Sequence, residues 1–197
     1  MVFDTTADNT GHLTAACIKI QEKLNRPLLW SGCCHHIGEL VIHHVFTDLK
    51  IEASKSPDIS LFTRLRDNWE LIPRKCPPNH LSMEGLTEEA QALVTRLKTE
   101  LLSLQAVKKD FVRDDYDELL SLSVAFVSEE VTEVSFRSPG ALHKARWMSK
   151  IIYALKIVLL EPEIADLPKG TITSNTQVPK LRYEQFFFSK LKQKANL

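Results

Sequence analysis

Long apolar runs, a secretion leader and a regular set of cysteines are all missing from this chain of 197 residues. No stretch approaches the roughly 18 apolar residues that a membrane-spanning helix needs, because Lys156 interrupts the longest candidate at residues 151–160. The opening residues, MVFDTTADNTG, contain neither a basic segment nor a long apolar one, so we expect no signal peptide. These absences favour an intracellular protein that has no membrane partner.

Sequence signatures of several enzyme classes are missing as well. The chain contains no glycine-rich phosphate loop, no dinucleotide fingerprint and no Gly-x-Ser-x-Gly elbow. Kinases, dehydrogenases and serine hydrolases therefore lose support, and we expect no small-molecule cofactor. The cysteines, Cys17, Cys33, Cys34 and Cys76, include an adjacent pair and lack the spacing of a disulfide scaffold, so reduced thiols are expected.

The composition that remains is that of a globular protein, with 44% hydrophobic and 25% charged residues. A chain of this length can bury a core, and it usually forms one domain or one domain with an extension. Its net charge of zero hides an asymmetry, because residues 1–136 hold 14 Lys and Arg against 21 Asp and Glu, whereas residues 137–197 hold 11 against 4. The basic part is suited to nucleic-acid phosphates, although solvated helix faces produce similar counts.

Residues 1–50 predict alternating strands and helices. Short apolar runs at residues 1–3 and 28–31 are typical of buried strands. Apolar positions at helical spacing predict helices over residues 12–24 and 35–49, and Asn25-Arg26-Pro27 ends the first of them. Strand, helix and strand within about thirty residues match the size of a parallel crossover unit.

The chain after Pro57 predicts a mostly helical region. Helices are expected over residues 59–71, 88–104 and 115–127, with a break at 75–79. A turn at 135–140 precedes the most apolar helix, 141–160, which Pro162 and Pro168 end. The sequence thus predicts an α/β fold with a mostly α-helical extension. Its expected parts are residues 1–50, a helical insert at 51–134 and a basic helical segment at 135–197.

Asp4 directly follows the first predicted strand. Carboxylates at the end of an apolar strand hold divalent metal in many nucleotidyl-transfer enzymes. The simpler interpretation is that Asp4 caps the next turn. Asp8 and Asn9 also most simply serve this turn or cap the helix that follows.

Thiols and imidazoles gather between residues 33 and 44, at the junction of the second strand and its helix. Cys33 and His36 form a Cys-x-x-His pair, and His36 and His43 fall on one helix face. Such groups are suitable zinc ligands, but no second pair stands at finger spacing, and nothing sets the distance to Cys76 or His80. A purely structural junction is the alternative, and we expect no bound zinc.

Basic residues surround an aromatic one near the start of the last predicted helix. Lys144, Arg146 and Lys150 could reach a DNA backbone, and Trp147 could stack on a base. More often, a tryptophan at helical spacing simply belongs to a core.

Short motifs in this order resemble the hAT superfamily of DNA transposases and their domesticated relatives. They are FDTT with NTG at residues 3–11, Cys33-x-x-His36 followed by ELV at 39–41, and ARWMS at 145–149. In that family a strand-end Asp is the second of three metal-binding acids, a Cys-x-x-His pair follows the next strand, and an Arg-Trp pair lies in a later helical region. The resemblance implies a ribonuclease-H-like unit with Asp4 as the second acid, a Mg²⁺ ligand if the protein is active, and Arg146 with Trp147 at the later position.

The resemblance leaves two of the three acids without a match. The first catalytic Asp of the family lies on an upstream strand, for which Met1 leaves no room, and the third, a Glu on a late helix, is not convincingly matched by Glu161 or Glu184. Two-metal phosphoryl transfer needs several carboxylates around ions about 4 Å apart, so Asp4 alone cannot build the site. We therefore expect a partial ribonuclease-H-like unit in a fragment or remnant of a hAT-like transposase. It would lack strand-transfer activity and retain nucleic-acid or protein binding.

Two alternatives stay open. One is a magnesium-dependent DNA nuclease or transferase in which Asp4 joins Asp8 or a distal Glu. The other is a zinc-binding interaction module built on Cys33, His36 and His43. The family resemblance implies a nuclear protein, with DNA and a further copy of the chain as the partners to consider.

Overall fold

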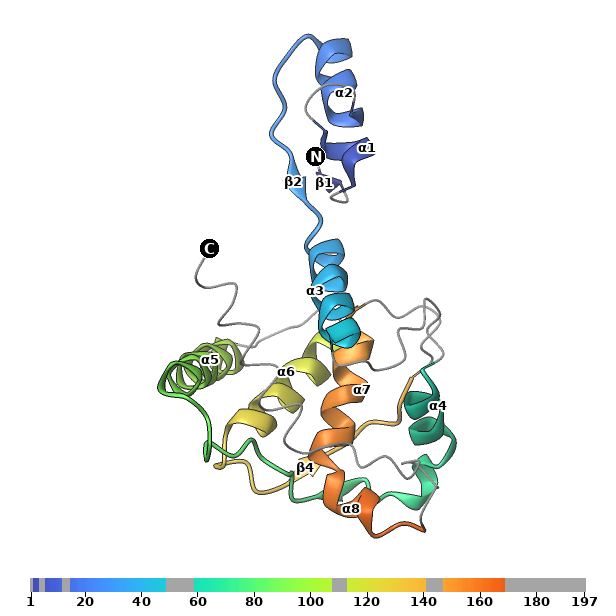
Figure 1. Ribbon diagram of the computed structural model, residues 1–197, viewed down its shortest axis with the longest axis vertical. Coiled ribbons are helices and arrows are strands. Elements are labelled where there is room, and N and C mark those ends of the chain that lie inside the picture. The colour runs from blue at the N-terminus through green and yellow to red at the C-terminus, as the bar shows by residue number, and fades with distance from the viewer. Residues whose placement is uncertain are drawn as a thin grey trace. The chain divides into compact units, whose positions relative to one another are not determined.

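The computed structural model describes residues 2–3, 6–11, 15–48, 59–107, 113–140 and 147–168. Its contacts divide the chain into two compact units, residues 1–45 and 46–197. The described residues are mostly helical, and their strands form two short pairs, one parallel and one antiparallel (Figure 1). A mixed α/β composition with a predominance of helix is therefore confirmed. No described helix is long and apolar enough to cross a membrane.

The first unit alternates strands and helices, as the sequence predicts. Strand β1 (Val2–Phe3) pairs in parallel with β2 (Ser31–Gly32). Between the strands lie α1 (Ala7–Thr10) and α2 (Ala16–Leu24), and α3 (Cys34–Asp48) begins shortly after β2. Parallel strands require a crossover connection, which α2 supplies here.

The end of α2 shows how one residue reverses the chain. Asn25 adopts the left-handed conformation, with φ 47° and ψ 40°, and its N–H bonds back to the carbonyls of Gln21 and Glu22. Asparagine adopts this conformation more easily than most residues other than glycine. The Gln21 side chain then accepts a hydrogen bond from the Leu28 N–H at 3.0 Å. The predicted end of this helix is confirmed.

One local prediction for this unit was wrong. Strand pairing falls on Ser31 and Gly32, and the apolar residues 28–30 carry none of it. Leu29 leaves 93% of its surface exposed. The prediction placed the strand on the more apolar residues. The register with β1, however, decides which backbone groups form hydrogen bonds.

The second unit is built around α6 (Asp114–Val127) and α7 (Trp147–Leu159), which pack against each other (Figure 1). The other elements are α4 (Ser60–Asp67), the 3-10 turn η1 (Trp69–Leu71), β3 (Lys75–Cys76), α5 (Glu88–Val107), β4 (Val134–Ser135) and α8 (Glu161–Ala165). α5 packs on α6, and α8 packs on α7. Buried side chains of α4, η1, α6, α7 and α8 form one core, in which Leu65, Ala125 and Leu159 are fully enclosed.

Helix predictions for this unit are confirmed in position, with corrections at their ends. The helix expected over residues 59–71 is α4 followed by η1, and residues 141–146 of the last predicted helix lie outside the described residues. Pro162 does not end the helical region but lies in the first turn of α8. Backbone N–H groups in a first turn form no hydrogen bond within the helix, so proline is tolerated there.

The segments predicted as a break, 75–79, and as a turn, 135–140, each include part of a short strand. These two strands, β3 and β4, pair with each other. Cys76 lies opposite Val134 and Lys75 opposite Ser135 in an antiparallel ladder. Cys76 and Val134 face the core, while Lys75 and Ser135 are exposed. Two residues are too short to show the alternation that marks a strand, so local pattern reading missed this pair.

A strap of chain, residues 77–81, holds the C-terminal ends of α6 and α7 together. Asn79 N–H donates to Leu159 O at 2.9 Å, and Leu81 N–H donates to Phe126 O at 2.8 Å. Asn79 Nδ2 also donates to Val158 O at 3.1 Å and to Glu161 Oε2 at 2.9 Å. The last carbonyls of a helix have no partner within the helix, and the strap supplies donors to several of them.

Substitution of Asn79 tests this role of the strap. We expect Asn79→Ala to lower the free energy of unfolding by about 1–2 kcal/mol, because it removes one donor that serves both a helix-end carbonyl and Glu161. Urea denaturation followed by circular dichroism measures the change. Gln105→Ala, an amide removal at an exposed position of α5, is the matched control. Equal stability of the two variants would contradict the role assigned to Asn79.

Candidate functional site

The parallel pairing of β1 and β2 brings two sequence motifs to the same strand ends. Phe3 pairs with Gly32. Asp4 is the next residue in the sequence after Phe3, and Cys33 is the next after Gly32. Asp4 itself lies outside the described residues, so its predicted role as a metal ligand stays a prediction.

Asn9 has the turn-stabilising role that the sequence predicts. Its N–H donates to Thr6 O at 3.0 Å, and its Nδ2 donates to Thr6 Oγ1 at 3.2 Å. Both bonds close the turn that leads into α1. Asp8 is exposed in the same short helix.

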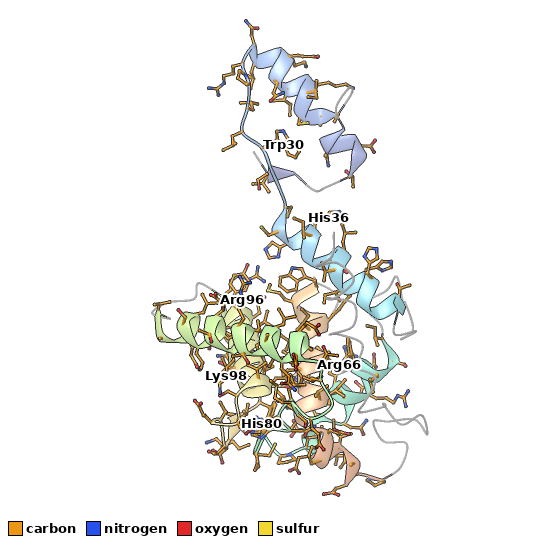
Figure 2. The ribbon with its side chains drawn as sticks, turned by 60° about the vertical axis from the view of Figure 1, so that its left-hand side comes forward. Trp30, His36, Arg66, His80, Arg96 and Lys98 are labelled. Carbon is orange, nitrogen blue, oxygen red and sulfur yellow. The ribbon has the colours of Figure 1, made fainter. Side chains whose placement is uncertain are left out.

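Cys33 directly precedes α3, and His36 lies in the first turn of this helix (Figure 2). The carbonyl of Cys33 accepts the N–H of Ile37 at 3.0 Å, so Cys33 is the residue from which the helix begins. Both side chains are half-buried, whereas Cys34 and His43 are exposed. The Cys-x-x-His pair is therefore held by a strand end and the first turn of a helix.

Cys76 and His80 both have structural contacts within the second unit. Cys76 is 5% exposed and belongs to the core of the second unit, where burial first and the nearby Glu163 second raise its pKa. His80 Nδ1 donates to Ala125 O at 2.8 Å, as part of the strap (Figure 2). In the part of the chain that the structure describes, no three His, Cys, Asp or Glu side chains form a group that could share a metal ion.

The predicted nucleic-acid-binding segment is described only in part. Trp147 and Lys150 lie in the first turn of α7 and are both half-buried, while Met148 between them is 3% exposed. Lys144 and Arg146 lie outside the described residues. Trp147 and Lys150 therefore border the core without entering it fully.

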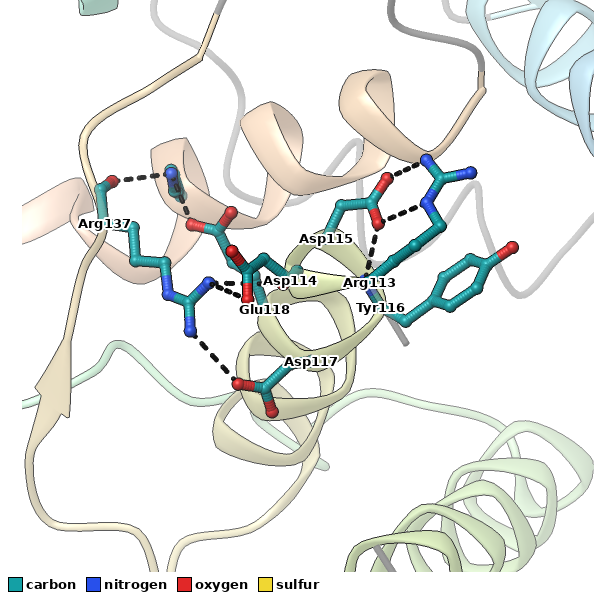
Figure 3. Close-up of polar contacts among 8 residues, drawn as sticks. Arg113, Asp114, Asp115, Tyr116, Asp117, Glu118 and Arg137 are labelled. Atoms are coloured by element: carbon teal, nitrogen blue, oxygen red, sulfur yellow. Dashed lines mark hydrogen bonds and ion pairs between the residues drawn. The ribbon is translucent and has the colours of Figure 1, made fainter. Parts of the chain in front are cut away.

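Sequence reasoning missed a group of ion pairs at the start of α6 (Figure 3). Arg137 reaches Asp117 at 3.2 Å and Asp114 at 3.6 Å. Arg113 pairs with Asp115 through both of its oxygens and lies over the Tyr116 ring, 5.0 Å from its centroid. Carboxylates in the first turn of a helix are stabilised by the helix dipole, although exposed pairs like these contribute only about 0–1 kcal/mol each.

Lys156 is a charged side chain enclosed in the core of the second unit, with 1% of its surface exposed. Its Nζ lies 2.6 Å from Glu118 Oε1, donates to Arg137 O at 2.7 Å and lies 5.5 Å from the centroid of the Trp69 ring. Burial lowers the pKa of Lys156, and the Glu118 carboxylate partly opposes this effect. α6, α7, η1 and the segment before α7 thus meet at one ammonium group.

The segment 136–140 is bound to α7 through its backbone. In addition to the Lys156 bond to Arg137 O, the Tyr153 hydroxyl donates to Gly140 O at 2.5 Å. Tyr153 also packs against the Phe62 ring at 5.1 Å between centroids. A sequence signal for this arrangement existed, because Lys156 is the lone charge within the apolar run at residues 151–160 and shares a helical face with Ile152 and Leu159.

Comparisons with protein-family models, with curated proteins and with solved structures find no match to this chain. The geometry defines a mixed α/β protein with a parallel-strand unit and a helical unit. Its first unit places the Cys-x-x-His pair directly after the parallel strands. Its second unit gathers buried charge between α6 and α7, which suits a structural role better than catalysis because Lys156 has almost no access to solvent.

Replacement of Lys156 tests the structural role. We expect Lys156→Met to lower the free energy of unfolding by about 3 kcal/mol, because it leaves Glu118 largely buried without its partner. A double variant, Lys156→Met with Glu118→Leu, should recover at least half of this loss, since removing both charges also removes the unpaired one. Urea denaturation measures all three proteins.

Lys150→Met is the matched control, because Lys150 stands on the same helix and is only half-buried. Its effect should stay within about 1 kcal/mol of the wild type. A Lys156→Met protein as stable as Lys150→Met would show that the buried pair does not support the core.

Proposed function

We propose that the chain is a fragment or remnant of a hAT-like DNA transposase, with a partial ribonuclease-H-like unit at its start. On this proposal it does not catalyse strand transfer by itself and retains nucleic-acid binding through its basic C-terminal part. A nuclear location belongs to the same proposal. The observation that carries the proposal is the parallel β1–β2 pair with its motifs directly after the strands.

Parallel pairing supports the proposal because it discriminates between classes of fold. Parallel strands occur almost only in α/β proteins whose strands are joined by helices. Antiparallel pairing of β1 with β2 would have argued against a ribonuclease-H-like unit. The order strand, helix, strand, helix, with Cys33 and His36 at the entry to α3, agrees with the order of motifs in the family.

The acids at the start of α6 are already engaged by basic side chains. Asp114, Asp117 and Glu118 each pair with a basic side chain, Arg137 or Lys156. Asp115 pairs with Arg113. These carboxylates neutralise charges of their own unit, and a pair of metal ions would have to compete with those partners.

The basic C-terminal part is suited to nucleic-acid binding by its charge and by the partial exposure of Lys150 and Trp147. Lys150 lies in the first turn of α7 with part of its surface accessible, and Trp147 lies beside it at the start of the same helix. Lys144 and Arg146 precede them in the sequence. Phosphate contacts by Lys and Arg need no fixed sequence of bases, so a remnant can keep them after losing its catalytic acids.

A nicking assay tests the lack of catalysis. Supercoiled plasmid incubated with Mg²⁺ should show the same background nicking with the wild-type chain and with Asp4→Ala, because one carboxylate cannot hold two metal ions. Gel electrophoresis over time measures the rates. Mg²⁺-dependent nicking by the wild type that Asp4→Ala abolishes would favour the alternative, an intact magnesium-dependent nuclease.

Salt dependence of DNA binding tests the proposed binding function. A triple variant, Lys144→Ala, Arg146→Ala and Lys150→Ala, should bind duplex DNA more weakly. The slope of log affinity against log salt should fall in magnitude by about 2–3, since each phosphate contact contributes about 0.9. Fluorescence anisotropy with a labelled duplex at several salt concentrations measures both quantities.

The control removes the same charge elsewhere in the second unit. Arg74 and Lys98 are paired with Glu70 and Glu130, and Lys75 lies exposed in β3. Their triple alanine variant should retain the wild-type slope. Equal slopes for the wild type and both triple variants would contradict the assignment of DNA binding to this segment.

A further inference from the structure

α5 carries an apolar stripe that its packing on α6 leaves uncovered. Val94 is 3% exposed, whereas Leu93, Leu97, Leu104 and Val107 are 37%, 41%, 51% and 71% exposed. These four residues are separated by three, four or seven positions, so they lie along one side of the helix. We call them the α5 stripe.

Glu100 stands in the middle of the α5 stripe. It follows Leu97 by three positions and precedes Leu104 by four, so it shares their side of the helix. Arg96 lies one turn earlier, but the described residues show no ion pair between it and Glu100. Lys98, on another side of α5, is already paired with Glu130 at 3.1 Å (Figure 2). An apolar partner with a basic residue near its centre would complement this surface.

A second copy of the chain is a poor occupant of the α5 stripe. Leu93 and Val107 are equally far from Glu100 in sequence, and Leu97 and Leu104 nearly so. Antiparallel pairing of two stripes therefore places Glu100 against its own copy, and parallel pairing in register does the same. Like charges brought face to face destabilise a helix pair.

The chain itself contains a segment with the complementary chemistry. Residues 180–194, KLRYEQFFFSKLKQK, lie outside the described residues and combine apolar with basic side chains. Five of its residues are Lys or Arg, against a single acid, Glu184. Its densest apolar part, Phe186 to Phe188, is followed closely by Lys190, Leu191 and Lys192. Residues 169–179 connect it to α8 and span at most roughly 36–40 Å.

We propose that residues 180–194 bind the α5 stripe of the same chain. Phe186 to Phe188 and Leu191 cover Leu97 and Leu104, and Lys190 or Lys192 pairs with Glu100. The contact removes apolar surface of both partners from water, which supplies most of the free energy. The ion pair selects the basic segment over a second stripe.

Zero-length cross-linking of the full-length protein tests the proposal. A carbodiimide joins a carboxylate to an amine only when the two are in contact, and mass spectrometry of the digest identifies the joined residues. We expect a cross-link from Glu100 to Lys190 or Lys192, within one chain. The Lys98–Glu130 pair, which the structure shows, is the internal positive control.

Reversing the charges of the proposed ion pair tests whether the cross-link depends on that pair. Glu100→Lys alone should abolish the cross-link, and combining it with Lys190→Glu and Lys192→Glu should restore one in the opposite sense. Glu100 is exposed and Lys190 and Lys192 lie outside the described residues, and the Lys98–Glu130 cross-link reports whether each variant is still folded.

A mixture of isotope-labelled and unlabelled protein separates the possible occupants. Glu100 cross-links that join labelled to unlabelled chains would show a partner copy, and would overturn the proposal. Absence of any Glu100 cross-link while Lys98–Glu130 still forms would also overturn it. Glu100 cross-links to Lys190 or Lys192 within single chains only, restored in the opposite sense by the charge reversal, would establish it.

Discussion

The second unit depends on one buried ammonium group. A charge removed from water is costly unless partners replace the water, and Lys156 obtains a carboxylate from α6, a backbone carbonyl from the segment before α7 and an aromatic face from η1. The ammonium group is stabilised fully only when all three partners are in position. The same group therefore orients α6, α7 and the chain that connects them.

The strap at residues 77–81 performs a similar task at the C-terminal ends of these helices. Backbone and side-chain donors from Asn79, His80 and Leu81 reach carbonyls in the last turns of α6 and α7. Both the strap and Lys156 join residues that are far apart in the sequence through polar groups. Apolar packing alone permits small shifts of one helix along another, and directional hydrogen bonds limit such shifts.

The proposed transposase ancestry rests on the first unit. The parallel strands pair Phe3 with Gly32, the residue before Cys33, and the first turn of α3 after Cys33 holds His36. In the proposed transposase ancestry this is the middle portion of a catalytic fold, which needs acids from other segments of chain to act on DNA. The helical unit, by contrast, uses its acids to neutralise Arg113, Arg137 and Lys156.

Local pattern alone determined most of the helices in this protein. Apolar spacing located α2, α3, α5, α6 and the described part of α7, and Asn25 marked the end of α2, because these depend on neighbours within a few residues. Tertiary structure decided the rest. The register of β1 with β2, the pairing of Cys76 with Val134 and the partners of Lys156 depend on contacts between distant residues, which sequence spacing does not encode.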